Sequence, residues 1–447
     1  MPPLALRQGE CQLPPTAIRP AEEGGHNGAV DLDRLAALRS PTGAQALAAA
    51  AELVTADPLT AAAALRARGI PADLAAAALT QVDLRRRAVS KFGPLANAMY
   101  FTRAGLEQAT RAIVAKRRAA RLRAAGVRTL ADLGCGLGAD AIAAARAGIR
   151  VYGIEADPLT AAMAAANAEA VGVADLFTVD VGDATTVDVS GFDAVFCDPA
   201  RRHSGTGRRV FDPDAYSPPW SFVTSLAKRV PRTVLKVAPG IDHALLPPDA
   251  EAEWVSVDGD LVEATIWFGP LARVPRRATL LSERRAARSQ EAVLSQEKEE
   301  GVGEAASAQL TGSGRETAPL GGVRRYLYDP DPAVVRAHLV AEFAATVDGT
   351  LADASIAYVY ADAAVATPYA RCLEVIDTLP YSVKRLRALL RERGIGRLEI
   401  LKRGLPVQPD QLRRDLRLDG PESASLVLTR VAGAPTALLC RPVVASA

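Results

Sequence analysis

The sequence contains little cysteine and little histidine, and both shortages narrow what the chain can be. Its five cysteines stand far apart without a C-x-x-C pair. This spacing argues against a disulfide framework or an ordinary zinc site and favours a reducing cytoplasm. The four histidines are scattered as well, so no His-rich metal motif is available. We therefore expect a cytoplasmic protein without a bound metal.

Long hydrophobic runs are also missing. No stretch approaches the roughly 18 apolar residues that a membrane-spanning helix needs. The first twenty residues lack the apolar run of a signal peptide. We expect no membrane association.

Net charge is nearly absent, because 53 Lys and Arg face 51 Asp and Glu in 447 residues. Taken alone, a charge of +2 argues against a nucleic-acid partner. The charge is unevenly distributed, however: +8 over 1–128, −7 over 129–282, −2 over 283–322 and +3 over 323–447. Segment 83–128 alone holds twelve basic and two acidic residues. Because binding partners respond to local fields, this segment is a candidate for contact with phosphates.

The composition, 49% hydrophobic and 23% charged, is that of a globular chain with two to four domains. Periodicity and composition divide it into a disordered tail, a basic helical domain, an α/β domain, a flexible linker and a small α+β domain. The corresponding ranges are 1–28, 29–128, 129–282, 283–322 and 323–447.

From residue 129 short β-rich runs alternate with helical stretches, which predicts a doubly wound, Rossmann-like parallel sheet. The helices are expected at 139–147 and 158–170. The strands are expected at 129–133, 150–154, 176–179, 194–197, 233–237, 253–257 and 264–268. The last two strands lie so close in the sequence that they can form a hairpin at the sheet edge.

A glycine-rich turn, D-L-G-C-G-L-G, follows the first strand and opens a helix. Gly134, Gly136 and Gly138 let the backbone turn sharply and approach a ligand closely. The N–H groups at the helix start can then face that ligand. A dinucleotide-binding loop would read G-x-G-x-x-G, whereas this one reads G-x-G-x-G and resembles the first motif of class I S-adenosylmethionine-dependent methyltransferases.

Acidic residues follow the next two strands. Glu155, 21 residues beyond Gly134, is placed to accept hydrogen bonds from the ribose hydroxyls of an adenosine ligand. Asp183 stands where class I methyltransferases often place an acidic residue on the adenine amine. Asp132, within the glycine-rich motif, completes the candidate cofactor-binding residues.

The fourth strand leads into D-P-A-R at residues 198–201, which is similar to the D-P-P-R of some RNA base methyltransferases. Asp198 lies where a parallel sheet opens toward its substrate and can take a hydrogen bond or proton from a substrate nitrogen. Pro199 fixes the backbone, and Arg201 completes the candidate catalytic set. Cys197 and Cys135 are expected to be small buried residues rather than nucleophiles.

A cationic loop follows, R-R-H-S-G-T-G-R-R at 201–209. Its Arg202, Arg208 and Arg209 can pair with phosphate oxygens, although a solvated charged loop explains them equally well. Lys236, at the end of the fifth strand, either contacts substrate or pairs with a carboxylate such as Asp198.

Together these motifs resemble a bacterial family of class I methyltransferases with a C-terminal THUMP-like domain. The resemblance covers most of residues 85–447 outside 283–322. Besides the core motifs, it is carried by residues 91–92, 99–102, 105–110, 326–330 and 400–404. It implies S-adenosyl-L-methionine as cofactor, and RNA only by analogy with THUMP domains proper.

The sequence thus favours a methyltransferase that modifies a base nitrogen in tRNA or rRNA and grips it through 83–128 and Arg201–Arg209. An alternative interpretation is a small-molecule or protein methyltransferase with the same core. Another is a non-catalytic RNA-binding protein, since Ala200 replaces the second proline. A nicotinamide oxidoreductase is disfavoured by the glycine spacing.

Overall fold

The structure, a computed structural model, describes residues 31–53, 57–201, 216–283 and 307–443. It comprises two compact units, residues 1–83 and 84–447, which are described separately. The division falls within a continuous helix, α4 (Ala72–Phe92). The larger unit therefore begins near residue 84, whereas the sequence places the domain boundary at 128.

The smaller unit is helical, as the sequence predicts. Its helices are α1 (Leu32–Arg39), α2 (Pro41–Glu52), α3 (Pro58–Ala67) and the first half of α4. Each of the first three starts at a polar cap, because Asp31, Ser40 and Asp57 accept hydrogen bonds from backbone N–H groups of the first turn. Alanine and leucine side chains such as Leu38, Ala50 and Leu65 form its buried face.

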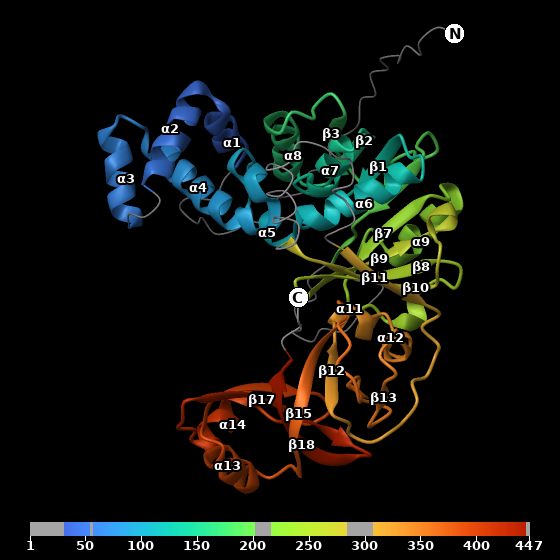
Figure 1. Cartoon of the computed structure of the whole chain (residues 1–447). Coiled ribbons are helices and arrows are strands. Elements are labelled where there is room, and N and C mark those ends of the chain that lie inside the picture. The colour runs from blue at the N-terminus through green and yellow to red at the C-terminus, as the bar shows by residue number, and fades with distance from the viewer. Residues whose placement is uncertain (1–30, 54–56, 202–215, 284–306, 444–447) are drawn as a thin grey trace, which may run out of the picture. The chain divides into compact units, whose positions relative to one another are not determined.

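The larger unit begins with the second half of α4, which is followed by α5 (Arg103–Gln108) and α6 (Ala112–Ala124). It then builds a nine-stranded sheet of order β11-β10-β8-β9-β7-β4-β1-β2-β3 (Figure 1). Strands β3, β2, β1, β4 and β7 are parallel. Their bounds are β1 Thr129–Leu133, β2 Arg150–Glu155, β3 Phe177–Val181, β4 Ala194–Cys197 and β7 Thr233–Val237. The helices α7 (Ala139–Arg146) and α8 (Pro158–Ala170) lie between the first strands in sequence, and α9 (Trp220–Arg229) precedes β7. The predicted Rossmann-like α/β fold is confirmed.

The far end of this sheet is mixed. Strands β8 (Glu251–Val257) and β9 (Asp260–Trp267) form the expected antiparallel hairpin, and β10 (Arg276–Leu281) pairs parallel to β8. Contrary to the prediction, the hairpin does not lie at the sheet edge, because further strands extend the sheet beyond β8. Strand β11 (Ser307–Gly312) then adds antiparallel to β10. The prediction of a structureless linker over 283–322 is therefore wrong for 307–312, where the backbone completes the sheet edge.

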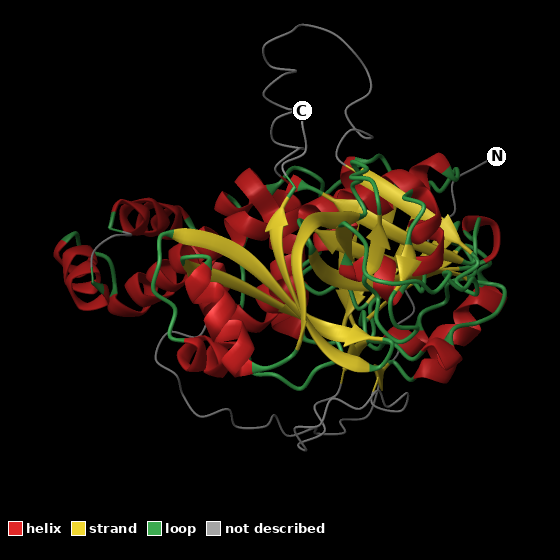
Figure 2. Ribbon diagram, turned by 60° about the horizontal axis from the view of Figure 1, so that its bottom comes forward, coloured by secondary structure: helices red, strands yellow, loops and turns green. Residues whose placement is uncertain are grey.

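The C-terminal part forms a seven-stranded sheet of order β13-β14-β12-β15-β18-β17-β16. Figure 2 distinguishes the helices and strands of the chain by colour. Its strands are β12 Tyr326–Pro330, β13 Thr350–Leu351, β14 Val359–Ala361, β15 Ala370–Pro380, β16 Ile395–Lys402, β17 Glu422–Val431 and β18 Ala434–Pro442. Its helices are α11 (Pro332–Arg336), α12 (Val340–Thr346), α13 (Val383–Glu392) and α14 (Pro409–Leu416). The small α+β architecture predicted for this region is present.

Two sequence motifs of this region meet in space. Arg403, in the K-R-G stretch after β16, lies 2.7 Å from the Asp329 carboxylate of β12 and 3.3 Å from the Pro330 carbonyl. Its guanidinium also covers the ring of Tyr358. The following Gly404 has a φ of 81°, a conformation that glycine adopts without strain. Both motifs thus have a structural role in holding this domain together.

The arginines of α6 enter a buried charged cluster on the nine-stranded sheet. Arg121 donates two 2.7 Å hydrogen bonds to the carboxylate of Glu251 and a third to the Leu271 carbonyl. Its guanidinium stacks 3.9 Å from the centre of the Trp267 ring. Glu251 is fully buried. Burial alone would raise the pKa of Glu251, but hydrogen bonds from Arg121 and Arg277 lower it to about 2.

The neighbouring arginines complete this cluster. Arg117 pairs with Glu253 at 2.7 Å, and Arg118 joins Asp140 of α7 to Glu263 of β9. Burial opposes the charge on Arg118, but these two carboxylates outweigh it and raise its pKa above the ordinary value. The cluster therefore joins α6, α7 and the β8–β9 hairpin into one body.

Replacing Arg121 with Ala should destabilise this body by about 3–5 kcal/mol, because a buried carboxylate then loses its counter-charge. All three tryptophans of the chain, Trp220, Trp254 and Trp267, lie in α9, β8 and β9. Their fluorescence during urea unfolding therefore reports on this domain. Arg123→Ala, an exposed change on the same helix, is the control and should stay within about 0.5 kcal/mol. Equal midpoints for the two variants would contradict the role given to the cluster.

Candidate functional site

The glycine-rich turn between β1 and α7 has the backbone that its sequence requires. Gly134, Gly136 and Gly138 have φ values of 88°, 55° and 83°. A Cβ at Gly138 would lie 2.9 Å from the Phe177 ring, so this glycine serves packing. No atom lies within 4 Å of a Cβ built on Gly136. The middle glycine therefore leaves open space over the turn, where a ligand can approach the backbone.

Glu155, the last residue of β2, lies against this turn. Its Oε2 accepts a 3.0 Å hydrogen bond from the Gly136 N–H, and its Oε1 accepts one from the Asp157 N–H. The carboxylate is half-buried and is held in place from both sides. This position fits the predicted contact with a ribose.

Asp183 follows β3 and is exposed. Its Oδ1 accepts 2.8 Å hydrogen bonds from the N–H and hydroxyl of Thr185, which lower the pKa of the carboxyl. It thereby caps its own short turn. Oδ1 is used in this way, so the predicted hydrogen bond from the adenine amine would be accepted by Oδ2.

Asp132 is a residue of β1, just before the turn, and is only 1% exposed. Neither of its carboxylate oxygens has a hydrogen-bond partner among the described residues. Burial raises its pKa well above the ordinary value, and the nearby Asp140 and Asp198 raise it further. A buried polar group without a partner is costly, so this carboxyl is available to a donor from a bound molecule.

Asp198 follows β4, and its backbone oxygen lies 3.5 Å from a Cβ built on Gly134. Its side chain, 35% exposed, accepts a 2.6 Å hydrogen bond from Lys236 of β7. Lys236 also donates to the Thr110 hydroxyl at 3.0 Å. Burial disfavours the charge on Lys236, but Asp198, Glu263 and other carboxylates outweigh it and raise its pKa. Lys236 therefore stays protonated and pairs with Asp198, one of the two alternatives that the sequence left open.

The rest of the D-P-A-R motif is only partly visible. Pro199 is buried directly after Asp198. The backbone of residues 200–201 pairs with that of 216–217 in a short antiparallel ladder. The side chain of Arg201 lies outside the described residues, and so do Arg202, Arg208 and Arg209.

The two cysteines at the site are poorly suited to nucleophilic catalysis. Cys135 and Cys197 are both buried. Burial raises the pKa of each thiol well above its ordinary value, and nearby carboxylates add to this shift. At neutral pH both thiols are protonated, whereas the thiolate is the reactive form.

The sequence reasoning missed Asn167, a fully buried residue of α8. Its Oδ1 accepts a 2.7 Å hydrogen bond from the Tyr100 N–H. Its Nδ2 donates to the carbonyls of Tyr100 and Leu137. This single amide therefore fixes the glycine-rich turn to the segment before α5. An asparagine in an alanine-rich helix was the only local signal.

Many of the basic residues in 83–128 are engaged within the molecule. Arg85 donates to backbone carbonyls at 98 and 99, Lys91 to those at 106, 107 and 109, and Arg111 pairs with Asp260. Arg117, Arg118 and Arg121 belong to the buried cluster. The side chains that are exposed are Arg86, Arg87, Arg103, Lys116, Arg123 and Arg128. The electrostatic surface of the segment is therefore much smaller than its local charge of +10 indicates.

Replacing Asn167 with Ala should remove three buried hydrogen bonds and destabilise the domain by about 2–4 kcal/mol. The Tyr100 amide should also exchange with deuterium faster, because it loses its acceptor. Asn97→Ala, an exposed change in the 3-10 helix Gly93–Asn97, provides the control. Unchanged exchange at residue 100 in the Asn167 variant would refute the clamp.

These observations fit an S-adenosylmethionine site. Open space over Gly136, the restrained carboxylate of Glu155 and the unpartnered Asp132 offer a cradle and acceptors for an adenosine ligand with an ammonium group. Among the described residues no group of three or more His, Cys, Asp or Glu could hold a metal ion. Nor, within the same ranges, is any helix long and apolar enough to cross a membrane. Fold and site together define a class I methyltransferase.

Comparison with known proteins agrees. A methyltransferase domain model matches residues 130–209, a THUMP domain-like model 370–442 and a domain of unknown function 31–88. An uncharacterized S-adenosylmethionine-dependent methyltransferase of Mycobacterium tuberculosis is 36% identical over 375 residues, 80% of this chain and 95% of that protein. The chain belongs to this family of S-adenosylmethionine-dependent methyltransferases with a C-terminal THUMP-like domain, as its motifs predict.

A solved structure shares the fold at lower identity. The putative methyltransferase of Porphyromonas gingivalis is 20% identical, with a TM-score of 0.68 over 90% of this chain and 99% of its own. The agreement extends over nearly the whole length of both chains.

Proposed function

We propose that this methyltransferase modifies RNA, at a base nitrogen in tRNA or rRNA. The observation that carries the proposal is that the same chain holds a methyltransferase site and a THUMP domain-like region at 370–442. This region contains fourteen basic and eight acidic residues. An excess of positive charge on a small domain favours contact with phosphates. The methyltransferase site contributes an acceptor, Asp198, of the kind that a base N–H needs.

The roles of the site residues follow from their positions. The backbone around Gly134 and Gly136, the carboxylate of Glu155 and the carboxyl of Asp132 would hold the cofactor, with Asp183 beside the adenine. S-adenosylmethionine supplies an electrophilic methyl group when bound. Asp198 would accept a hydrogen bond from the substrate N–H, align the nitrogen and hold its proton. Lys236 keeps the Asp198 carboxylate oriented.

Phosphate contacts belong to cations without an internal role. We assign them to exposed residues of 83–128 such as Arg87, Arg103 and Lys116, and to the Arg201–Arg209 loop, whose side chains lie outside the described residues. The four described cysteines are free thiols, which fits the reducing cytoplasm where tRNA and rRNA are found.

Glu155→Ala should weaken binding of S-adenosylhomocysteine about 10- to 100-fold, because a carboxylate that accepts ribose hydroxyls is lost. Isothermal titration calorimetry of the full chain measures this, with NAD as the comparison ligand. Asp175→Ala, an exposed change between α8 and β3, should bind normally. Equal affinity in both variants would show that Glu155 does not contact the ribose.

Asp198→Ala should reduce methyl transfer at least 100-fold while S-adenosylhomocysteine affinity stays within about threefold, because the residue acts on substrate. The assay compares modified nucleosides, by mass spectrometry, in RNA from cells that lack the protein and cells that carry either form. One methylated nucleoside should disappear without the protein and return only with the unaltered chain. An RNA nucleoside profile that does not change when the protein is absent would contradict an RNA substrate.

A further inference from the structure

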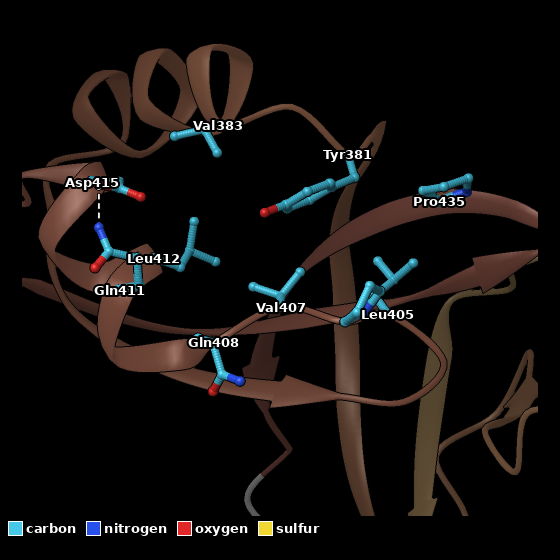
Figure 3. A pocket seen from close by; sticks show the side chains of 10 residues that line it. Tyr381, Val383, Leu405, Val407, Gln408, Gln411, Leu412, Asp415 and Pro435 are labelled. Atoms are coloured by element: carbon cyan, nitrogen blue, oxygen red, sulfur yellow. Dashed lines mark hydrogen bonds between the residues drawn. The ribbon is translucent and has the colours of Figure 1, made fainter.

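The THUMP-like domain contains a pocket of about 430 Å³ between α13, α14 and the loop after β16. Tyr381 projects into it between Val383 on one side and Val407 on the other (Figure 3). Leu405, Leu412 and two prolines, Pro406 and Pro435, complete its apolar lining. The volume falls in the range of small-ligand sites, and the lining is that of a site for a flat apolar group.

One end of this pocket is polar. Gln408, Gln411 and Asp415 line it from the start and the end of α14. Gln411 donates a 2.9 Å hydrogen bond to Asp415 Oδ1, and Arg414 donates one of 2.6 Å to Gln411 Oε1. Amides and a carboxylate offer both donors and acceptors. A ligand that is flat and apolar on its faces but polar along its edge matches this arrangement.

Three cations are close in sequence or in space to residues that line the pocket. Lys402 donates to the Val407 carbonyl at 2.7 Å, Arg414 contacts Gln411, and Lys384 follows Val383 in the first turn of α13. All three side chains are exposed. Among the described residues, none of the three forms an ion pair with a carboxylate, whereas Arg371, Arg393 and Arg441 of the same domain do. The positive charge next to the pocket is therefore available to an anionic ligand.

We propose that this pocket holds one unstacked base of single-stranded RNA, stacked on Tyr381, while Lys384, Lys402 and Arg414 contact the flanking phosphates. The inference rests on the proposed function, because it supplies the second point at which the RNA substrate is held. Sequence-specific RNA recognition commonly places unstacked bases on aromatic side chains and reads their edges with polar groups. An apolar cavity beside unpaired cations suits this ligand better than an apolar peptide, which would leave the cations unused.

The test uses fluorescein-labelled single-stranded RNAs of about 12 nucleotides, uniform in A, C or U, and the full chain. Tyr381→Ala should weaken binding of the preferred RNA about tenfold, whereas Tyr381→Phe, which keeps the ring, should stay within twofold. The salt dependence of binding should not change in Tyr381→Ala, because stacking releases no counterions. Tyr326→Ala alters a half-buried tyrosine of the same sheet outside the pocket and serves as the control.

The triple variant Lys384→Ala, Lys402→Ala and Arg414→Ala should show the opposite pattern. Its affinity should fall most at low salt, and the slope of log affinity against log salt should lose about 0.7 per phosphate contact. RNA containing 5-iodouridine should crosslink under ultraviolet light to the peptide that carries Tyr381, which tests the pocket without any variant.

The outcomes separate this inference from the proposed function. If Tyr381→Ala binds RNA with the affinity of the wild type and methylates it equally well, and if the crosslinks lie elsewhere, the base-binding role of the pocket is refuted. The proposed function is then unaffected. Absence of RNA binding by the wild-type chain, with methylation of another substrate, would overturn both. Equal loss of binding in Tyr381→Ala and Tyr381→Phe would show that the Tyr381 hydroxyl, and not stacking on the ring, holds the RNA.

Discussion

The methyltransferase domain depends on the buried charged cluster between α6 and the β8–β9 hairpin. Glu251 and Glu253 are fully buried, so each needs a counter-charge in the fold. Arg117, Arg121 and Arg277 supply it. Because the pKa of Glu251 is lowered in the folded protein, its contribution to stability is complete above about pH 4.5. It disappears as the pH falls toward about 2.

This cluster changes the meaning of the basic segment before the sheet. Counted along the sequence, segment 83–128 suggests a continuous surface for phosphate. In the structure, part of that charge neutralises glutamates more than 120 residues away, such as Glu251 and Glu263, and part of it caps helices and loops. Several acidic residues of the α/β domain, among them Asp140, Glu251 and Glu263, are the partners of arginines in α6. Part of the opposite charge of these two segments therefore reflects ion pairs between them.

The features that could be predicted from the sequence are those that a local residue pattern determines. The alternation of short apolar runs and helices predicts β1, β4 and β7 to the residue, and the glycine-rich turn is found between β1 and α7, where the sequence predicts it. Strand β11 was missed because Leu310 is its only buried residue, and its position depends on pairing with β10. The contacts of Asn167 with Tyr100 and of Thr110 with Lys236 were not predicted, because these partners are 67 and 126 residues apart in sequence. Long-range hydrogen bonds leave no periodic trace.

The Asp198 carboxylate, which we propose acts on the substrate, illustrates how these distant contacts converge. Lys91 of α4 donates to the carbonyls of Leu106, Glu107 and Ala109 and so fixes the chain directly before Thr110. Thr110 accepts a hydrogen bond from Lys236, and Lys236 holds Asp198. Each donor in this series is a lysine that is at least partly buried, so water competes little for its bonds. A lysine that the sequence offered as a phosphate contact therefore helps to set the orientation of Asp198. The segment before the sheet thus acts on Asp198 through position, apart from the phosphate contacts that we assign to its exposed cations.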